Sequence, residues 1–257
     1  ELDYLGIHIE VRDDGIHLSQ HPMISKLVHD IAGKANSPAC AYDSGDFLTE
    51  ERIATDGVPL EPHHAAAYRS KAAAALYISK RTRPDILLAV NQLCRHAHNP
   101  NVGDNRALVR LLRYLSATRH KHLRLPAGGT LRVEAHIDAA FASDKKDRKS
   151  ITGAVVFVGG AMVWAKSGKQ SIVTKSSFEA ELVALSDMSS MVLWISMFLR
   201  DMGFTLEVPM VYQDNQSTMR IAKQGLSNNP NTKHIDIRYM WIKNVLEENQ
   251  LSLGYIP

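Results

Sequence analysis

The sequence lacks three features that would point to particular classes of protein. It has two cysteines in 257 residues, Cys40 and Cys94, without metal-type spacing, which argues against a disulfide scaffold or a zinc ribbon. No apolar run approaches the roughly 20 residues that span a bilayer, and no secretory signal opens the chain. Repeats and low-complexity tracts are absent too. We therefore expect a globular, intracellular protein with no membrane partner.

The size and composition fit one large or two ordinary globular domains. Hydrophobic residues make up 45% and charged residues 22% of the chain. The Pro-Ala-Gly-Gly segment at 126–129 is the best candidate boundary and predicts domains at 1–125 and 130–257. Because the chain begins at Glu1 without Met and ends just after a strand-like run, we expect it to be a piece of a longer polypeptide.

Positive charge is concentrated in the middle of the chain. The net charge of the chain is only +3. Residues 69–124, however, contain twelve Lys and Arg residues and only two acidic residues, Asp85 and Asp104, so this segment has a net charge of +10. The remaining residues therefore carry −7. This asymmetry indicates a polyanionic partner for the middle of the chain.

The first half predicts a hairpin followed by helices. Strand-like alternation at 2–20 surrounds an Asp13-Asp14-Gly15 turn, and we interpret the paired aspartates as turn residues rather than a catalytic pair. Beyond it the expected elements are a short helix at 23–32, a long irregular connection at 34–62, and helices at 64–80, about 84–97 and 104–117. We expect Arg106, Arg110 and Arg113 to share one exposed face of the last helix, either solvated or in contact with phosphates.

The second half predicts a mixed sheet covered by helices. Residues 131–142 alternate apolar and polar side chains with the two-residue period of a half-buried strand. The expected elements after it are strands at 151–158 and 161–166, a helix at 177–202, a strand at 208–213, a short helix ending near 224, a helix at 233–248 and a strand from 251. This order is typical of the α/β (α+β) class.

Three carboxylates occupy positions that suit a metal site. Asp138 lies near the end of the central strand, and Asp214 lies at the end of a later strand, where it could instead cap the next helix. On the long helix Ser176-x-x-Glu179 is a capping-box pattern, whereas Glu181 heads the apolar face that packs on the sheet. A carboxylate there is costly unless it binds a cation. We therefore expect Asp138, Glu181 and Asp214 to converge within roughly 4–7 Å and to hold two divalent cations.

Ordered motifs carry a resemblance over nearly the whole chain. The chain resembles the C-terminal part of the Pol polyprotein of a copia-type LTR retrotransposon. Matches to the end of its reverse transcriptase include Tyr4-Leu5-Gly6-Ile7, Tyr68-Arg69-Ser70, Thr82-Arg83-Pro84-Asp85 and Leu112-Arg113-Tyr114-Leu115. Matches to its ribonuclease H domain include Ser150-Ile151-Thr152-Gly153, Ser176-Ser177-Phe178-Glu179-Ala180-Glu181, Asp214-Asn215-Gln216-Ser217 and Lys233-His234-Ile235-Asp236.

The resemblance implies a role for each candidate residue. Asp138, Glu181 and Asp214 fall on the first three carboxylates of the ribonuclease H site, which would bind Mg²⁺, with Mn²⁺ possible. The fourth carboxylate of the family should lie beyond Pro257, with Asp236 as an alternative. Lys233 and His234 would position nucleic acid or cap their helix.

The implied fold is a helical reverse-transcriptase thumb or connection region followed by a ribonuclease H-like mixed sheet with flanking helices. The implied activity is hydrolysis of RNA in RNA–DNA hybrids. The partners would be the hybrid and the rest of the Pol polyprotein, within a cytoplasmic virus-like particle if the element is active.

Two departures from the family keep a second hypothesis open. The Tyr-x-Asp-Asp polymerase site is absent, so this segment should not polymerise alone. Asp104-Asn105 stand where the family usually has a His and an aromatic residue. The alternative is therefore a catalytically inactive, nucleic-acid-binding remnant of a decayed retroelement. A resolvase or integrase-like nuclease on the same sheet is a third reading, which the upstream motifs disfavour.

Overall fold

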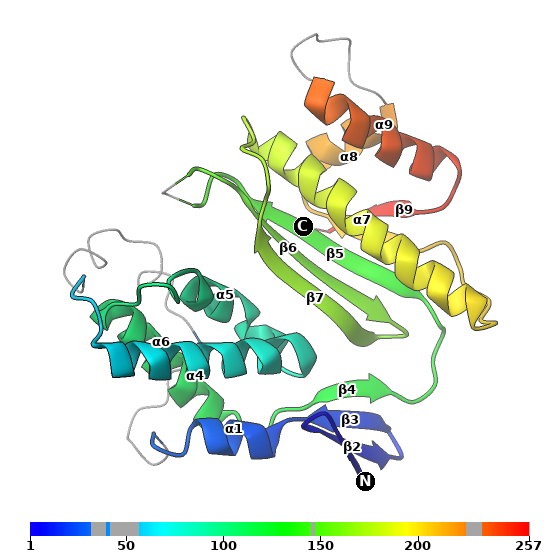
Figure 1. The fold of residues 1–257 in the computed structure, drawn as a ribbon. Coiled ribbons are helices and arrows are strands. Elements are labelled where there is room, and N and C mark those ends of the chain that lie inside the picture. The colour runs from blue at the N-terminus through cyan, green and yellow to red at the C-terminus, as the bar shows by residue number, and fades with distance from the viewer. Residues whose placement is uncertain (32–39, 42–56, 145–146, 225–232, 257) are drawn as a thin grey trace. The chain divides into compact units, whose positions relative to one another are not determined.

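The computed structural model describes residues 1–31, 40–41, 57–144, 147–224 and 233–256 (Figure 1). Its contacts divide the chain into two compact units, Glu1–Ala127 and Gly128–Pro257. The division falls within residues 126–129, the turn-forming segment at which the sequence predicts a boundary. Most of the irregular connection predicted at 34–62 lies outside the described residues.

The first unit contains a small antiparallel sheet. Its strands lie in the order β1, β2, β3, β4 and comprise Leu2–Tyr4, Ile7–Arg12, Gly15–Ser19 and Leu123–Pro126. The predicted hairpin is β2–β3, and β1 and β4 extend it on either side. In its turn the Asp14 carboxylate bonds the His17 ring and accepts a hydrogen bond from Arg124. Asp14 therefore has a structural role.

Gly15 is required where β4 pairs with β3. Its φ is +138°, and an added Cβ would lie 2.1 Å from the carbonyl oxygen of Leu125. Any larger residue would push the two strands apart, so glycine is needed for the close approach as well as for the turn.

Helices form the rest of the described first unit. They are α1, α4, η1, α5 and α6, with bounds His21–Leu27, Pro62–Arg81, Pro84–Ile86, Leu87–Arg95 and Val102–Ala117. Proline lies at the start of α1, α4 and η1, because its fixed φ suits the first helical turn and its missing N–H is not needed there. Helix α1 ends before the predicted Ala32. The helix predicted at about 84–97 begins as the 3₁₀ turn η1 and ends at Arg95.

Helix α6 begins with a capping box and packs on three other helices. Asn101 accepts a hydrogen bond from the Asp104 N–H at 2.8 Å, and the Asp104 carboxylate accepts one from the Asn101 N–H at 2.9 Å. Arg106 is exposed, but Arg110 and Arg113 are half-buried. The expectation that all three arginines share an exposed face therefore holds for Arg106 but not for Arg110 and Arg113.

A buried arginine joins η1 to the end of α6. The Arg83 side chain is 2% exposed and donates to both carboxylate oxygens of Asp85, at 2.9 and 2.7 Å. It also donates to the carbonyl and hydroxyl oxygens of Thr118. Tyr114 donates a further hydrogen bond to Asp85 at 2.8 Å. Burial alone would raise the pKa of Asp85, but Arg83 and Tyr114 hold that pKa below its usual value.

Replacing Arg83 with leucine should destabilise the first unit by about 3 kcal/mol, since the change leaves the Asp85 carboxylate without its paired cation and the Thr118 carbonyl without this donor. Chemical denaturation followed by circular dichroism measures this change. The double variant Arg83→Leu, Asp85→Leu should recover part of the loss, because no uncompensated charge remains. If the single variant unfolds like the wild type, the arginine does not stabilise this unit.

The second unit is a five-stranded mixed sheet with helices packed on it, as the sequence predicts (Figure 1). Its strands lie in the order β7, β6, β5, β8, β9 and comprise Ala161–Lys169, Ile151–Val158, Val133–Ala140, Met210–Gln213 and Ser252–Tyr255. Strands β5, β6 and β7 pair antiparallel, whereas β8 is parallel to both β5 and β9. The predicted fold class is confirmed.

Helix α7 (Ser177–Asp201) covers the centre of this sheet. The alternate residues Val133, Ala135, Ile137 and Ala139 of β5 are buried against it. Its own stripe of Leu185, Met188, Val192 and Ile195 completes the core. Helices α8 (Gln216–Gln224) and α9 (Lys233–Glu247) pack beside α7.

Helix α7 is also apolar enough to meet a membrane criterion. Its length and composition alone would allow it to cross a bilayer, so the expectation that no apolar run approaches the length of a membrane span does not hold for this helix. However, 56% of its most apolar stretch is buried inside the protein, which is typical of the central helix of a folded core.

Candidate metal centre

The three predicted carboxylates lie together in the second unit. Asp138 is on β5, Glu181 is in the second turn of α7, and Asp214 directly follows β8. One oxygen from each carboxylate lies within 4.8 Å of the others. Asp138 and Asp214 are exposed, whereas Glu181 is only 5% exposed. The arrangement is an acidic cluster with two exposed carboxylates and one buried carboxylate.

Parallel pairing of β5 with β8 brings the two aspartates together. His136 pairs with Tyr212 in the register of these strands, and each aspartate lies two residues further along its own strand. Residues two apart on a strand point to the same face, so Asp138 and Asp214 emerge side by side at the same end of the sheet. The convergence therefore depends on this register.

Aromatic packing supports the register just before the two aspartates. The rings of His136 and Tyr212 stack with centroids 5.0 Å apart, and Phe157 meets His136 edge-on at 5.8 Å. On β9 a Cβ added to Gly254 would lie 2.8 Å from the Tyr212 ring. Glycine at that position therefore leaves the ring room to lie over β9.

Glu179 and Glu181 occupy the different positions that the sequence predicts. Ser176 caps α7 by accepting a hydrogen bond from the Glu179 N–H at 3.2 Å. The Glu179 carboxylate accepts from the Lys175 N–H at 2.5 Å, rather than from the Ser176 N–H of an ideal capping box. It is therefore occupied at the start of the helix, and Glu181 is the glutamate that faces the two aspartates.

Glu181 is the most perturbed carboxyl of the cluster. Burial, followed by the negative charge of Asp138, raises its pKa to about 8, although a hydrogen bond from the Ala139 backbone opposes the change. Below that pH the metal-free site keeps a proton on Glu181. The folded state then loses stability as pH rises from 4.5 towards 8, because the unfolded chain has already released this proton.

The cluster has the chemistry of a divalent-cation site. Carboxylate oxygens are hard ligands that suit Mg²⁺ and Mn²⁺, and a cation would remove the repulsion among three carboxylates. Among the described residues, this is the one group of three or more candidate ligands close enough to share an ion. Its residues therefore fit the metal that the resemblance implies.

The remaining predicted site residues lie elsewhere or outside the description. Arg106, Arg110 and Arg113 are on α6 in the first unit. The side chains of Lys233, His234 and Asp236 lie outside the described residues, so nothing tests their predicted roles or the proposal of Asp236 as a fourth ligand.

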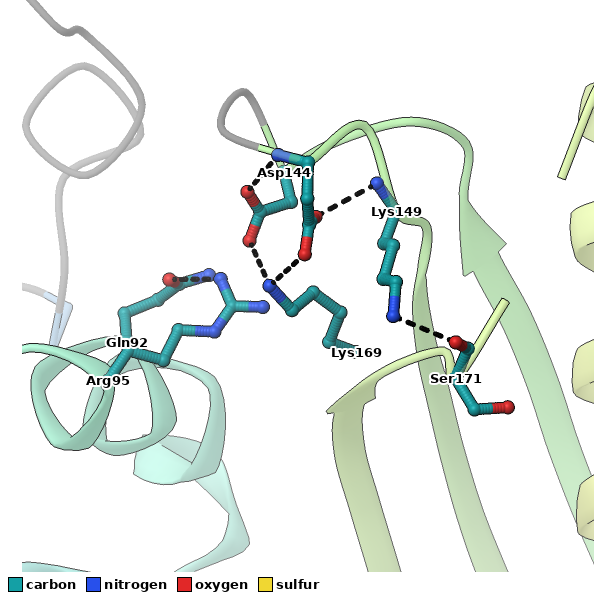
Figure 2. Close-up of polar contacts among 7 residues, drawn as sticks. Gln92, Arg95, Asp144, Lys149, Lys169 and Ser171 are labelled. Atoms are coloured by element: carbon teal, nitrogen blue, oxygen red, sulfur yellow. Dashed lines mark hydrogen bonds and ion pairs between the residues drawn. The ribbon is translucent and has the colours of Figure 1, made fainter. Parts of the chain in front are cut away.

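An ion-pair network, which the sequence does not indicate, lies where β5 leads to β6. The Lys169 ammonium at the end of β7 contacts Asp144 at 3.1 Å and Asp147 at 2.7 Å (Figure 2). Lys149 donates to the Ser171 carbonyl at 2.8 Å. The Lys169 hydrogen bond holds the pKa of Asp147 below its usual value. These contacts tie the connection that follows the strand bearing Asp138 to the end of β7.

Cation binding to this cluster should release a proton. Because Glu181 has a pKa of about 8, Mg²⁺ competes with its proton at neutral pH, and affinity should rise with pH until Glu181 ionises. Calorimetric titration in two buffers of different ionisation enthalpy measures the release. We expect about one proton per cation near pH 6.5 and almost none near pH 9. Glu181→Gln should abolish the release. Equal affinity at both pH values would contradict the assignment.

Comparison with known proteins places the chain among retrotransposon proteins. It is 33% identical over its whole length to the retrovirus-related Pol polyprotein from transposon RE1 of Arabidopsis thaliana, and it covers 17% of that protein. It is 30% identical over 92% of its length to the corresponding polyprotein from transposon TNT 1-94 of Nicotiana tabacum, of which it covers 18%. No protein-family model matches the chain.

The chain is thus similar over most of its length to retrovirus-related Pol polyproteins of transposons, and it spans less than a fifth of the length of these relatives. The resemblance seen in its motifs is confirmed. Among solved structures, LC11-RNase H1, isolated from compost by a metagenomic approach, is 17% identical, and the alignment covers 50% of this chain and 86% of that one with a TM-score of 0.38.

Proposed function

We propose that this chain provides the ribonuclease H activity of a copia-type retrotransposon Pol polyprotein, cutting the RNA strand of RNA–DNA hybrids during reverse transcription. The observation that supports the proposal best is the convergence of Asp138, Glu181 and Asp214 within 4.8 Å. Three carboxylates on rigid elements at one end of the central strands of a sheet are an arrangement that suits metal-assisted phosphodiester hydrolysis.

Each part of the chain has a role in this proposal. Asp138, Glu181 and Asp214 would hold Mg²⁺, or Mn²⁺ in its place, which supplies activation of water and stabilisation of the leaving oxygen. Glu181 gives up its proton when the cation binds. The +10 segment of the first unit, including Arg106, would contact the phosphates of the hybrid. The other partner would be the rest of the Pol polyprotein, in a cytoplasmic virus-like particle.

The alternative is a nucleic-acid-binding remnant without activity. The substituted pair Asp104-Asn105 favours it in sequence, but Asp104 forms the capping box of α6 and bonds the His96 ring. That substitution therefore has a structural explanation within the first unit. Both hypotheses predict that the chain binds the hybrid, but only the nuclease hypothesis predicts that it cuts the RNA strand.

Replacing Asp138 with asparagine should remove cleavage and spare binding. The change deletes one anionic ligand, so hydrolysis of a labelled RNA–DNA hybrid in Mg²⁺ should fall below about one hundredth of the wild-type rate. Hybrid affinity should stay nearly unchanged, because phosphate contacts dominate it. Glu179→Gln, at the glutamate that caps the helix, is the matched control and should still cut.

The assay is run on this chain and on the chain extended along its reading frame, since the resemblance implies a fourth carboxylate beyond Pro257. The extended chain should cut faster than the shorter one. If it binds hybrid but never cuts it, the remnant hypothesis replaces the nuclease.

The arginines of α6 should contribute to hybrid binding. Replacing Arg106, Arg110 and Arg113 with glutamine should lower the salt dependence of the affinity by up to about 0.9 logarithmic units per lost contact. Fluorescence anisotropy at several salt concentrations measures this slope. Arg12→Gln is the control, because Arg12 is paired with Glu10 outside the basic segment. An unchanged slope in the triple variant would mean that these arginines do not contact phosphate.

A further inference from the structure

We infer that Gln213 is a positioning residue that holds the Glu181 carboxylate in its metal-binding orientation. This inference rests on the proposed function and assigns a role to a residue outside the acidic cluster. Gln213 is the last residue of β8 and is fully buried. Its side-chain amide donates to Glu181 Oε2 at 2.9 Å.

The strand geometry explains how Gln213 reaches Glu181. Successive side chains of a strand point to opposite faces. Tyr212 and Asp214 therefore lie on one face of β8, while Gln213 points to the buried face that packs against α7. Asp214 and Gln213 can thus act on the same site from two sides of one strand end.

The Gln213 amide approaches Glu181 from the strand end that is followed by Asp214. When Glu181 is ionised, repulsion by the two aspartates would favour rotation of its side chain away from them. The hydrogen bond from Gln213 instead holds the carboxylate in the cluster and specifies its orientation.

Packing alone does not account for a glutamine at this position. The amide oxygen of Gln213 is buried and has no hydrogen-bond partner within the described residues. An unsatisfied buried oxygen is unfavourable, so packing by itself does not favour glutamine over an apolar side chain of similar size here. The glutamine is explained by the hydrogen bond that its side-chain nitrogen donates to Glu181.

Gln170 provides a matched control within the same unit. It too is a buried glutamine whose amide oxygen has no partner within the described residues. Its nitrogen, however, donates to the Thr152 hydroxyl at 3.0 Å and the Ala180 carbonyl at 2.8 Å. It therefore connects β6 to α7 without contacting a carboxylate of the cluster.

The test measures Mg²⁺ affinity by calorimetry and thermal stability by circular dichroism for the wild type, Gln213→Met and Gln170→Met. Gln213→Met should bind Mg²⁺ about tenfold more weakly, as expected when a residue that orients a metal ligand is removed, and its Tm should be no lower than that of Gln170→Met. Gln170→Met should lower Tm and leave the Mg²⁺ affinity within about twofold of the wild type. Gln213→Asn, whose amide is one methylene further from Glu181, should resemble Gln213→Met.

The outcomes separate this inference from the proposed function. If the wild type binds Mg²⁺ and both Gln213 variants bind it equally well, the positioning role is overturned while the metal centre stands. If Gln213→Met loses affinity only in proportion to a lower Tm, the glutamine is merely structural and the inference is again overturned. A wild type that neither binds Mg²⁺ nor cuts hybrid overturns both.

Discussion

Repulsion among three carboxylates is the constraint on which the second unit depends. Two negative charges about 4 Å apart repel by about 4 kcal/mol at the effective dielectric near a protein surface, and here three oxygens lie within 4.8 Å of one another. A flexible segment would relieve this repulsion by moving. The chain instead places Asp138, Glu181 and Asp214 on a strand, a helix and a strand end, so the repulsion is relieved by a proton or by a cation.

The surrounding contacts limit the movement of each carboxylate. The stacked rings of His136 and Tyr212 support the register of β5 and β8. The cap at Ser176 fixes where α7 begins, and with it the position of Glu181. The ion pairs of Lys169 with Asp144 and Asp147 hold the connection that follows β5. The rigidity of the site thus comes from packing, helix capping and ion pairs together.

The sequence predicted most elements, because hydrophobic periodicity and turn residues are local signals. It also separated Glu179 from Glu181, because their positions on one helix determine which of them faces the sheet. It did not predict β4, a short strand that ends in proline and pairs with β3 from the far end of the first unit. The contact of Gln213 with Glu181 was equally hidden, since it depends on how β8 and α7 pack. Long-range pairing leaves no local pattern.

The order β5, α7, β8 has a consequence for the synthesis of the protein. During translation Asp138 and Glu181 emerge before Asp214, and the parallel pairing of β5 with β8 can form only after the whole intervening hairpin and helix have been made. A nascent chain therefore contains two of the acidic groups without the third. A cation that needs all three carboxylates binds only to chains in which this crossover is complete. It therefore stabilises those chains by mass action.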